Sequence, residues 1–66
     1  MNIGWRVRDK QGDEGVVIAL VTLAQVTREE GGEPLIGDED VPYLLVKRPN
    51  GSTFYAAESS CKRMRG

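Results

Sequence analysis

Residues 41–57 constrain the fold more than any other stretch, because they predict a β-hairpin with a defined register. Two short apolar runs flank the turn formers of residues 48–52. A two-residue turn at Asn50 and Gly51 would place charged Lys47 opposite Phe54. A type I turn followed by a left-handed Gly51 instead pairs Arg48 with Ser52, Val46 with Phe54 and Leu44 with Ala56. Only the second register collects the apolar residues on one face, so we predict it. The opposite face then carries Tyr43, Leu45, Lys47, Thr53 and Tyr55.

The length and composition predict one small, non-enzymatic domain over residues 1–66. A chain of 66 residues buries a thin core, and self-association would add stability. The chain has no histidine, so it lacks the usual general base and the commonest metal ligand. We therefore expect no catalytic residues, no metal and no cofactor. Its single cysteine, Cys61, cannot form an internal disulfide, which suggests a reducing cytoplasm.

Charge is divided unevenly along the chain, although the net charge is only -1. Residues 1–40 carry four basic and nine acidic side chains, a balance of -5, and residues 41–66 carry five basic and one acidic, a balance of +4. Two regions of opposite sign can attract each other within one fold or between copies, or present a basic face to an anionic partner. An ordinary mixed surface is the alternative.

The remaining pattern predicts mainly strands. Residues 3–9 alternate, with Ile3, Trp5 and Val7 on one side. Residues 16–27 are rich in β-branched side chains and predict a strand bent at Ala19 or Ala24, with a helix over residues 19–30 as the alternative. The run over residues 16–24 is too short to span a bilayer, so we expect no membrane contact.

The second half of the chain predicts a loop, a helical turn and a last strand. Residues 28–42 should form an acidic loop, whose apolar pair at 35–36 docks on the body or opens a short strand. Acidic loops can bind calcium, but the EF-hand spacing is absent. Residues 58–61 suggest one helical turn with Ser59 as a candidate cap. Residues 62–65 would form the last short strand, with Met64 pointing inward.

Five short antiparallel strands in a chain of this size predict a small all-β barrel, because closure removes exposed edges. The segment Gly4-Trp5-Arg6-Val7-Arg8, followed by Gly12 and by Gly15-Val16-Val17, resembles the opening of SH3-like barrels such as KOW and Tudor domains. The hairpin, the single helical turn near Ser59 and the final strand resemble the closing half of that fold. The resemblance implies a five-stranded SH3-like barrel with a one-turn helix before the last strand.

A narrower resemblance concerns the plasmid-encoded trimethoprim-resistant dihydrofolate reductases. It rests on residues 6–12, RVRDKQG, and on the segment from Gly51 to Tyr55. Those enzymes are SH3-like barrels that assemble as tetramers around a pore carrying Val-Gln-Ile-Tyr. The equivalent stretch here is Ser52-Thr53-Phe54-Tyr55, so only the tyrosine is shared. Because the glutamine is missing, we do not expect folate or nicotinamide binding or reductase activity.

Few residues could carry chemistry, so the candidate sites are binding sites. Ser59, Ser60 and Cys61 have no histidine to activate them. Lys62 and Arg63 could lower the pKa of Cys61 and make it redox-sensitive, and a buried structural thiol is the alternative. The face with Tyr43, Leu45, Lys47, Thr53 and Tyr55 predicts a protein interface, including one with a second copy. Anion or nucleic-acid contacts are the second hypothesis, and their candidates are Arg6, Arg8, Arg48, Lys62 and Arg63.

Overall fold

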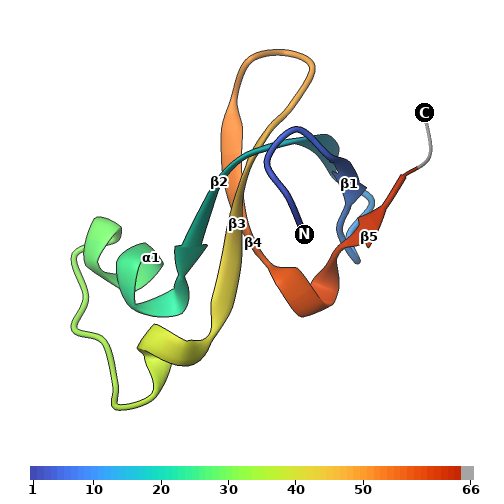
Figure 1. Ribbon diagram of the computed structural model, residues 1–66. Helices are drawn as coiled ribbons and strands as arrows, with labels where there is room; N and C mark the ends of the chain where they lie inside the picture. The colour runs from blue at the N-terminus through green and yellow to red at the C-terminus, as the bar shows by residue number, and fades with distance from the viewer. Residues whose placement is uncertain (65–66) are drawn as a thin grey trace.

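Five antiparallel strands form a single sheet in the computed structural model, which describes residues 1–64. The strands are β1 (Arg6–Arg8), β2 (Glu14–Thr22), β3 (Pro42–Lys47), β4 (Thr53–Ala57) and β5 (Lys62–Arg63). One α-helix, α1 (Leu23–Glu29), and two 3-10 helices, η1 (Asp38–Asp40) and η2 (Glu58–Ser60), lie in the connections (Figure 1). The strand order is β4-β3-β2-β1-β5, so β4 and β5 are the edges of an open sheet. The predicted five strands and the single turn before the last strand are confirmed.

The β3–β4 hairpin has the predicted turn and register. Gly51 adopts a left-handed conformation at φ 91°. Its N–H donates to the Arg48 carbonyl at 2.9 Å, and the Arg48 N–H donates to the Ser52 carbonyl at 2.7 Å. Val46 pairs with Phe54 and Leu44 with Ala56, as the apolar pattern required. A glycine is needed at position 51 because a side chain is strained at positive φ.

The predicted strand over residues 16–27 is wrong in its second half, and the fold is therefore mostly β rather than all-β. β2 ends at Thr22, and α1 follows at once. The Thr22 hydroxyl accepts from the Gln25 N–H at 3.3 Å, and the Gln25 side chain accepts from the Thr22 N–H at 2.9 Å. This capping box satisfies two N–H groups of the first turn, which stabilises a helix start by about 1 kcal/mol. A local cap thus outweighs the β-branched density. The alternative helix over residues 19–30 began too early.

β2 also contains a bulge, which lies between Val17 and Ala19. The sequence predicted a bend at Ala19 or Ala24, and the bulge lies beside the first of these. An extra residue on one strand bends that strand and increases its twist. β2 can therefore pair with β3 along one part of its length and with β1 along another.

The chain over residues 28–42 contains more regular secondary structure than the predicted loop. Its start belongs to α1, its end forms η1, and β3 begins at Pro42. The side chain of Asp38 accepts from the Leu35 N–H at 2.9 Å. Leu35 and Ile36 neither dock on the body nor open a strand, since they are 76% and 106% exposed. In a single chain, both apolar side chains are therefore exposed to solvent.

The core fills one side of the sheet, near the hairpin and β1. Its fully buried aliphatic side chains are Val7, Val17, Leu44 and Val46, and Ala56 and Cys61 complete the cluster. Trp5 and Phe54 are partly buried against it. This agrees with the apolar face predicted for the hairpin and with the prediction that Trp5 and Val7 share one side of the first strand.

Both ends of the chain differ from the sequence prediction in detail. The first strand is shorter than residues 3–9, and Ile3 is 63% exposed outside it. Ala57, not Ser59, is the N-cap of η2, with no side-chain cap hydrogen bond. The last strand ends at Arg63, and its continuation donates the Met64 N–H to the Arg6 carbonyl at 2.7 Å. Residues 65–66, including the predicted end of that strand, lie outside the described residues.

Candidate binding surface

The five residues predicted to form a binding face lie together on β3 and β4. Cross-strand partners project to the same side of a sheet. Leu45 pairs with Tyr55 and Lys47 with Thr53, and Tyr43 is diagonal to Tyr55. None of the five is buried: Lys47 and Thr53 are exposed, and the other three are half-buried. We call this side of the sheet the outer face, since Leu44, Val46 and Ala56 fill the core on the other side.

The outer face continues onto β2, which the sequence prediction missed. Ala19 pairs with Leu45, and Val21 pairs with Tyr43. Both β2 side chains are half-buried, so they extend the apolar surface across three strands. Ile18, at the bulge, is 41% exposed. The sequence pattern could not show that Ala19 and Val21 belong to this face, because the bulge shifts the register of β2. Strict alternation counted from Val16 assigns the residues after Val17 to the wrong side of the sheet.

The two tyrosines line a hollow of about 320 Å³ at the end of this face. Its other walls come from the β1–β2 turn, from the end of β4 and from Ser60 in η2. The turn is held by Asp9, whose side chain accepts from the N–H groups of Gln11 and Asp13, both at 2.9 Å. Two aromatic side chains beside a fixed turn make a concave surface that can accept a side chain from a partner.

The basic candidate residues are divided between the two sides of the sheet. Arg6, Arg8 and Lys62 share one side, and Arg63, which pairs with Val7, lies on the other. Arg8 donates to the Glu14 carboxylate, and it lines one hollow with Lys62. The Arg63 guanidinium stacks over the Trp5 ring, 3.9 Å from its centroid. These contacts occupy two of the five predicted anion-binding side chains. A single nucleic-acid track across all five is therefore not what the fold presents.

Arg6 and Arg48 instead meet Lys47 at a hollow of about 290 Å³. Arg6 pairs with Val16 across β1 and β2, and Val16 pairs with Lys47 across β2 and β3. We call Arg6, Val16 and Lys47 the basic row. Arg48 is held beside it by Asp13, at 3.3 Å, and by the Phe54 ring, 4.3 Å from its centroid. Residue types alone could not show this row, since it depends on two strand registers.

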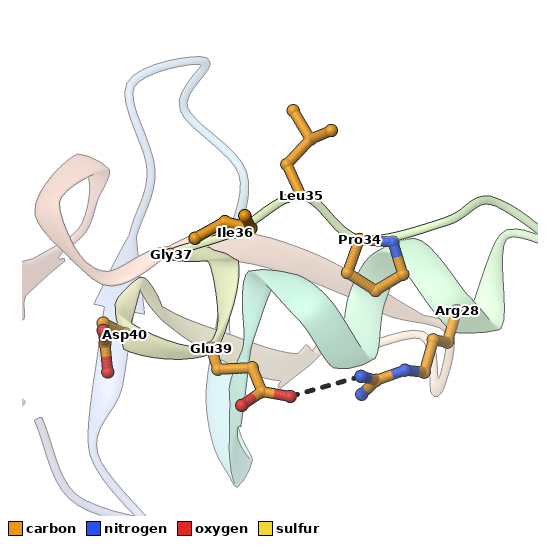
Figure 2. A pocket seen from close by; sticks show the side chains of 7 residues that line it. All are labelled: Arg28, Pro34, Leu35, Ile36, Gly37, Glu39 and Asp40. Carbon is orange, nitrogen blue, oxygen red and sulfur yellow. Dashed lines mark hydrogen bonds and ion pairs between the residues drawn. The ribbon is translucent and has the colours of Figure 1, made fainter.

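A fourth hollow, of about 390 Å³, is lined by residues of α1, of η1 and of the chain between them, where the sequence predicted an acidic loop. Figure 2 shows the side chains around it, with Leu35 pointing away from the ribbon. Arg28 crosses from α1 to Glu39, with 3.3 Å between guanidinium and carboxylate. This exposed pair contributes little stability, about 0.5 kcal/mol. The other lining residues are Pro34, Ile36, Gly37 and Asp40.

Comparisons with protein-family models, curated proteins and solved structures find no match. Within residues 1–64, no group of three His, Cys, Asp or Glu side chains is placed to hold a metal ion. In the same part of the chain, no helix has the length and apolar character needed to cross a membrane.

Cys61 is a buried core thiol rather than an activated one. Burial raises its pKa above the ordinary value of 9.0, and the nearby Asp9 and Glu58 carboxylates raise it further. Its side chain packs in the core cluster, and the residue is only 7% exposed. The idea that Lys62 and Arg63 lower this pKa is therefore wrong, because burial and the two carboxylates dominate. A thiol that stays protonated is a poor nucleophile.

The pKa of Cys61 predicts a pH dependence of stability. Below 9.0 the thiol is protonated in both states, so its packing contributes in full. Above that pH the unfolded thiol ionises first, and the free energy of unfolding falls as pH rises through the folded pKa. Urea unfolding of the wild type and of Cys61→Ala should therefore show a stability difference that shrinks above pH 9.0. A difference that stays constant across this range would contradict the assignment.

Proposed function

We propose that this chain is a non-enzymatic binding module that acts through protein–protein contacts on its outer face and associates with a second copy of itself. The observation that carries the proposal is the placement of Tyr43, Leu45 and Tyr55 on one open sheet face. Aromatic and aliphatic side chains gathered on a surface are typical of protein interfaces. The neighbouring β2 side chains extend the same apolar surface.

A second copy is the favoured partner for two reasons. The core is small, so buried interface area would add to the stability of each chain. Apolar side chains also remain exposed on one chain: Val16 at 37%, Ile18 at 41% and Leu35 at 76%. Packing of two outer faces by a two-fold axis brings the same patch of each chain together.

We further infer that the sheet curls into an SH3-like barrel, with its core inside and the outer face outside. The strand order, the bulge in β2 and the single turn η2 between β4 and β5 support this. A bulged β2 can serve two halves of a barrel, and η2 can carry the chain from one edge to the other. We expect the module to act in the cytoplasm, because it has no disulfide partner for Cys61.

The non-enzymatic part of the proposal rests on the candidate nucleophiles. Ser59 and Ser60 have no histidine to activate them, and Cys61 is buried with a raised pKa. Only Tyr55 is shared with the pore motif of the reductases that the chain resembles. A reductase function would require dihydrofolate-dependent oxidation of NADPH by the pure protein, and we expect none.

Replacing Tyr55 with glutamate is expected to abolish self-association. The change places a charge on the outer face, where burial against another copy would leave it unpaired. We expect light scattering or sedimentation to give a dimer mass of about 14.6 kDa, twice 7.3 kDa, for the wild type at micromolar concentration. The variant should give the monomer mass. Asn2→Glu adds the same charge at an exposed site off this face and should remain dimeric.

Two results would count against this function. One is a wild type that stays monomeric up to the highest soluble concentration. The other is a Tyr55→Glu chain that is folded by circular dichroism and dimerises as well as Asn2→Glu. The first result would show that the chain does not self-associate. The second would show that the copies associate through a surface other than the outer face.

Nucleic-acid binding is the second candidate, and the convergence of Arg6, Lys47 and Arg48 on one hollow favours it. It would appear as retention of RNA or DNA that weakens with salt and is reduced in a chain carrying Arg6→Glu and Arg8→Glu. The low isoelectric point of about 5.3 argues against it, since nucleic-acid-binding domains are usually basic. No retention at low salt would exclude it.

A further inference from the structure

The basic row leaves two cationic groups without an anionic partner. Arg6 and Lys47 are both exposed, and neither forms an ion pair with another residue in the described part of the chain. They flank Val16, which is 37% exposed, and their strands are neighbours of β2 on its two sides. The spacing between alternate strands is roughly 10 Å. Two flexible cations can thus converge on one carboxylate placed above Val16, while Gly15, Val16 and Pro49 give the hollow an apolar floor.

The acidic segment, residues 29–40, has the complementary surface. It carries six carboxylates and no basic residue. Among residues 1–64 its carboxylates form one ion pair, Arg28 with Glu39. Between them, Leu35 and Ile36 are 76% and 106% exposed. The segment therefore offers acids together with apolar side chains, and the basic row offers cations together with an apolar floor.

The two surfaces lie at opposite ends of β3 and are too far apart to meet within one chain. η1 precedes Pro42, the first residue of β3, whereas Lys47 is the last (Figure 1). Six residues of strand span roughly 20 Å, about twice the distance over which salt screens charges in physiological solution. The molecule measures 37 × 20 × 20 Å, so a separation of this size fits within it.

We propose that the acidic segment of one copy docks on the basic row of a second copy, and that the contact occurs twice in an antiparallel dimer. This inference rests on the proposed self-association and specifies its orientation. If the outer faces pack with β3 antiparallel to β3 of the partner, a two-fold axis places each acidic end beside a basic end. Carboxylates then reach Arg6 and Lys47, and the exposed pair Leu35 and Ile36 can cover Val16 and Pro49. A parallel arrangement would oppose like charges at both ends.

The test uses two charge reversals, each at an exposed residue. Lys47→Glu cancels the net positive charge of the basic row, and Asp40→Lys makes the acidic segment less acidic. In the homodimer of either variant, positions 40 and 47 carry like charges at both contacts. We therefore expect the dissociation constant of the dimer to rise by about a hundredfold. Arg63→Glu is the matched control, since it makes the same charge change on β5, where Arg63 pairs with Val7 and so lies on the side of the sheet opposite the row. That control should dimerise like the wild type.

Mixing the two weakened variants is the decisive measurement. In a mixed dimer, position 47 of the Lys47→Glu chain faces position 40 of the Asp40→Lys chain. At the other contact, the unchanged Asp40 of the first chain faces the unchanged Lys47 of the second. Both contacts then pair opposite charges. Sedimentation of the equimolar mixture should recover about 14.6 kDa, twice 7.3 kDa, where each variant alone is monomeric. The recovered dimer should weaken again as salt is raised.

The outcomes separate this inference from the proposed function. If the wild type dimerises and Tyr55→Glu disrupts it, but both charge reversals dimerise normally, the orientation is wrong and the self-association stands. Weakened single variants whose mixture stays monomeric would also overturn the orientation. If Lys47→Glu leaves the mass unchanged and removes salt-dependent retention of RNA, the row binds nucleic acid and the docking proposal fails. A monomeric wild type removes both proposals.

Discussion

Gly15→Ala is expected to remove most of the stability of the protein. Gly15 is buried on β2, and a Cβ atom there would lie 2.3 Å from the Lys47 carbonyl oxygen and 2.7 Å from Cγ1 of Val46. The nearest atom belongs to the backbone, so a rotamer change cannot relieve the overlap and β3 must move away from β2. Overpacking of this kind costs about 3 kcal/mol. A domain of this size has only about 3–5 kcal/mol of stability in total. Urea unfolding followed by Trp5 fluorescence and circular dichroism measures the loss.

Gly12→Ala is the matched control for this effect. Gly12 has φ 87°, and a Cβ atom there would meet nothing within 4 Å. The substitution therefore costs only the left-handed strain, about 1 kcal/mol, and the variant should remain folded. A Gly15→Ala chain as stable as Gly12→Ala would mean that β2 and β3 do not approach this closely. The comparison separates a close backbone contact from the ordinary loss of a glycine.

The hairpin could be predicted in full because its determinants are local. The turn residues, the positive φ at Gly51 and the alternation of apolar side chains all lie within 17 residues, and they agree with one another. The five candidate residues of the outer face followed from the same register. Consistency of turn chemistry and side-chain period is what specifies a register.

α1 could not be predicted from residue propensity, since its segment contains Val26 and Thr27, which favour strands. The deciding interaction is the capping box between Thr22 and Gln25, supported by burial of Ala24 and Val26. The Thr-x-x-Gln pattern is present in the sequence, so the helix start could have been found by looking for it. What the sequence does not contain is the packing that buries Ala24.

The basic row and the extension of the outer face required tertiary information. Arg6 and Lys47 are 41 positions apart in sequence and meet only because both strands pair with β2 at Val16. The bulge after Val17 then decides which later residues of β2 share a side with Leu45. Such a shift leaves no clear sign in residue types, because Ile18, Ala19 and Leu20 are all apolar. Predicting these two surfaces would therefore have required knowing how strands that are distant in sequence pair.

Leu44→Ala is expected to remove the largest fully buried aliphatic contact of the core. Leu44 is completely buried on β3, between β2 and β4, and it belongs to the main core cluster. Truncation of a buried leucine removes its transfer free energy and leaves a cavity, at a cost of about 2–5 kcal/mol. That range approaches the total of about 3–5 kcal/mol for a domain of this size. We therefore expect a variant that is largely unfolded at room temperature, or that unfolds at very low urea.

Leu20→Ala makes the same chemical change at a site that tests the topology. Leu20 pairs with Leu44 across β2 and β3, yet it is 52% exposed. Half of its side chain already contacts water, so truncation should cost about 1 kcal/mol or less. If the two variants differ greatly in their free energy of unfolding, the edge of the core lies between these paired leucines. If Leu20→Ala proved as damaging as Leu44→Ala, Leu20 would be covered in solution, and the covering copy would lie on the core side of the sheet rather than on the outer face, because Leu20 pairs with Leu44. The loss should then depend on protein concentration, since a dimer interface contributes stability only where the dimer forms.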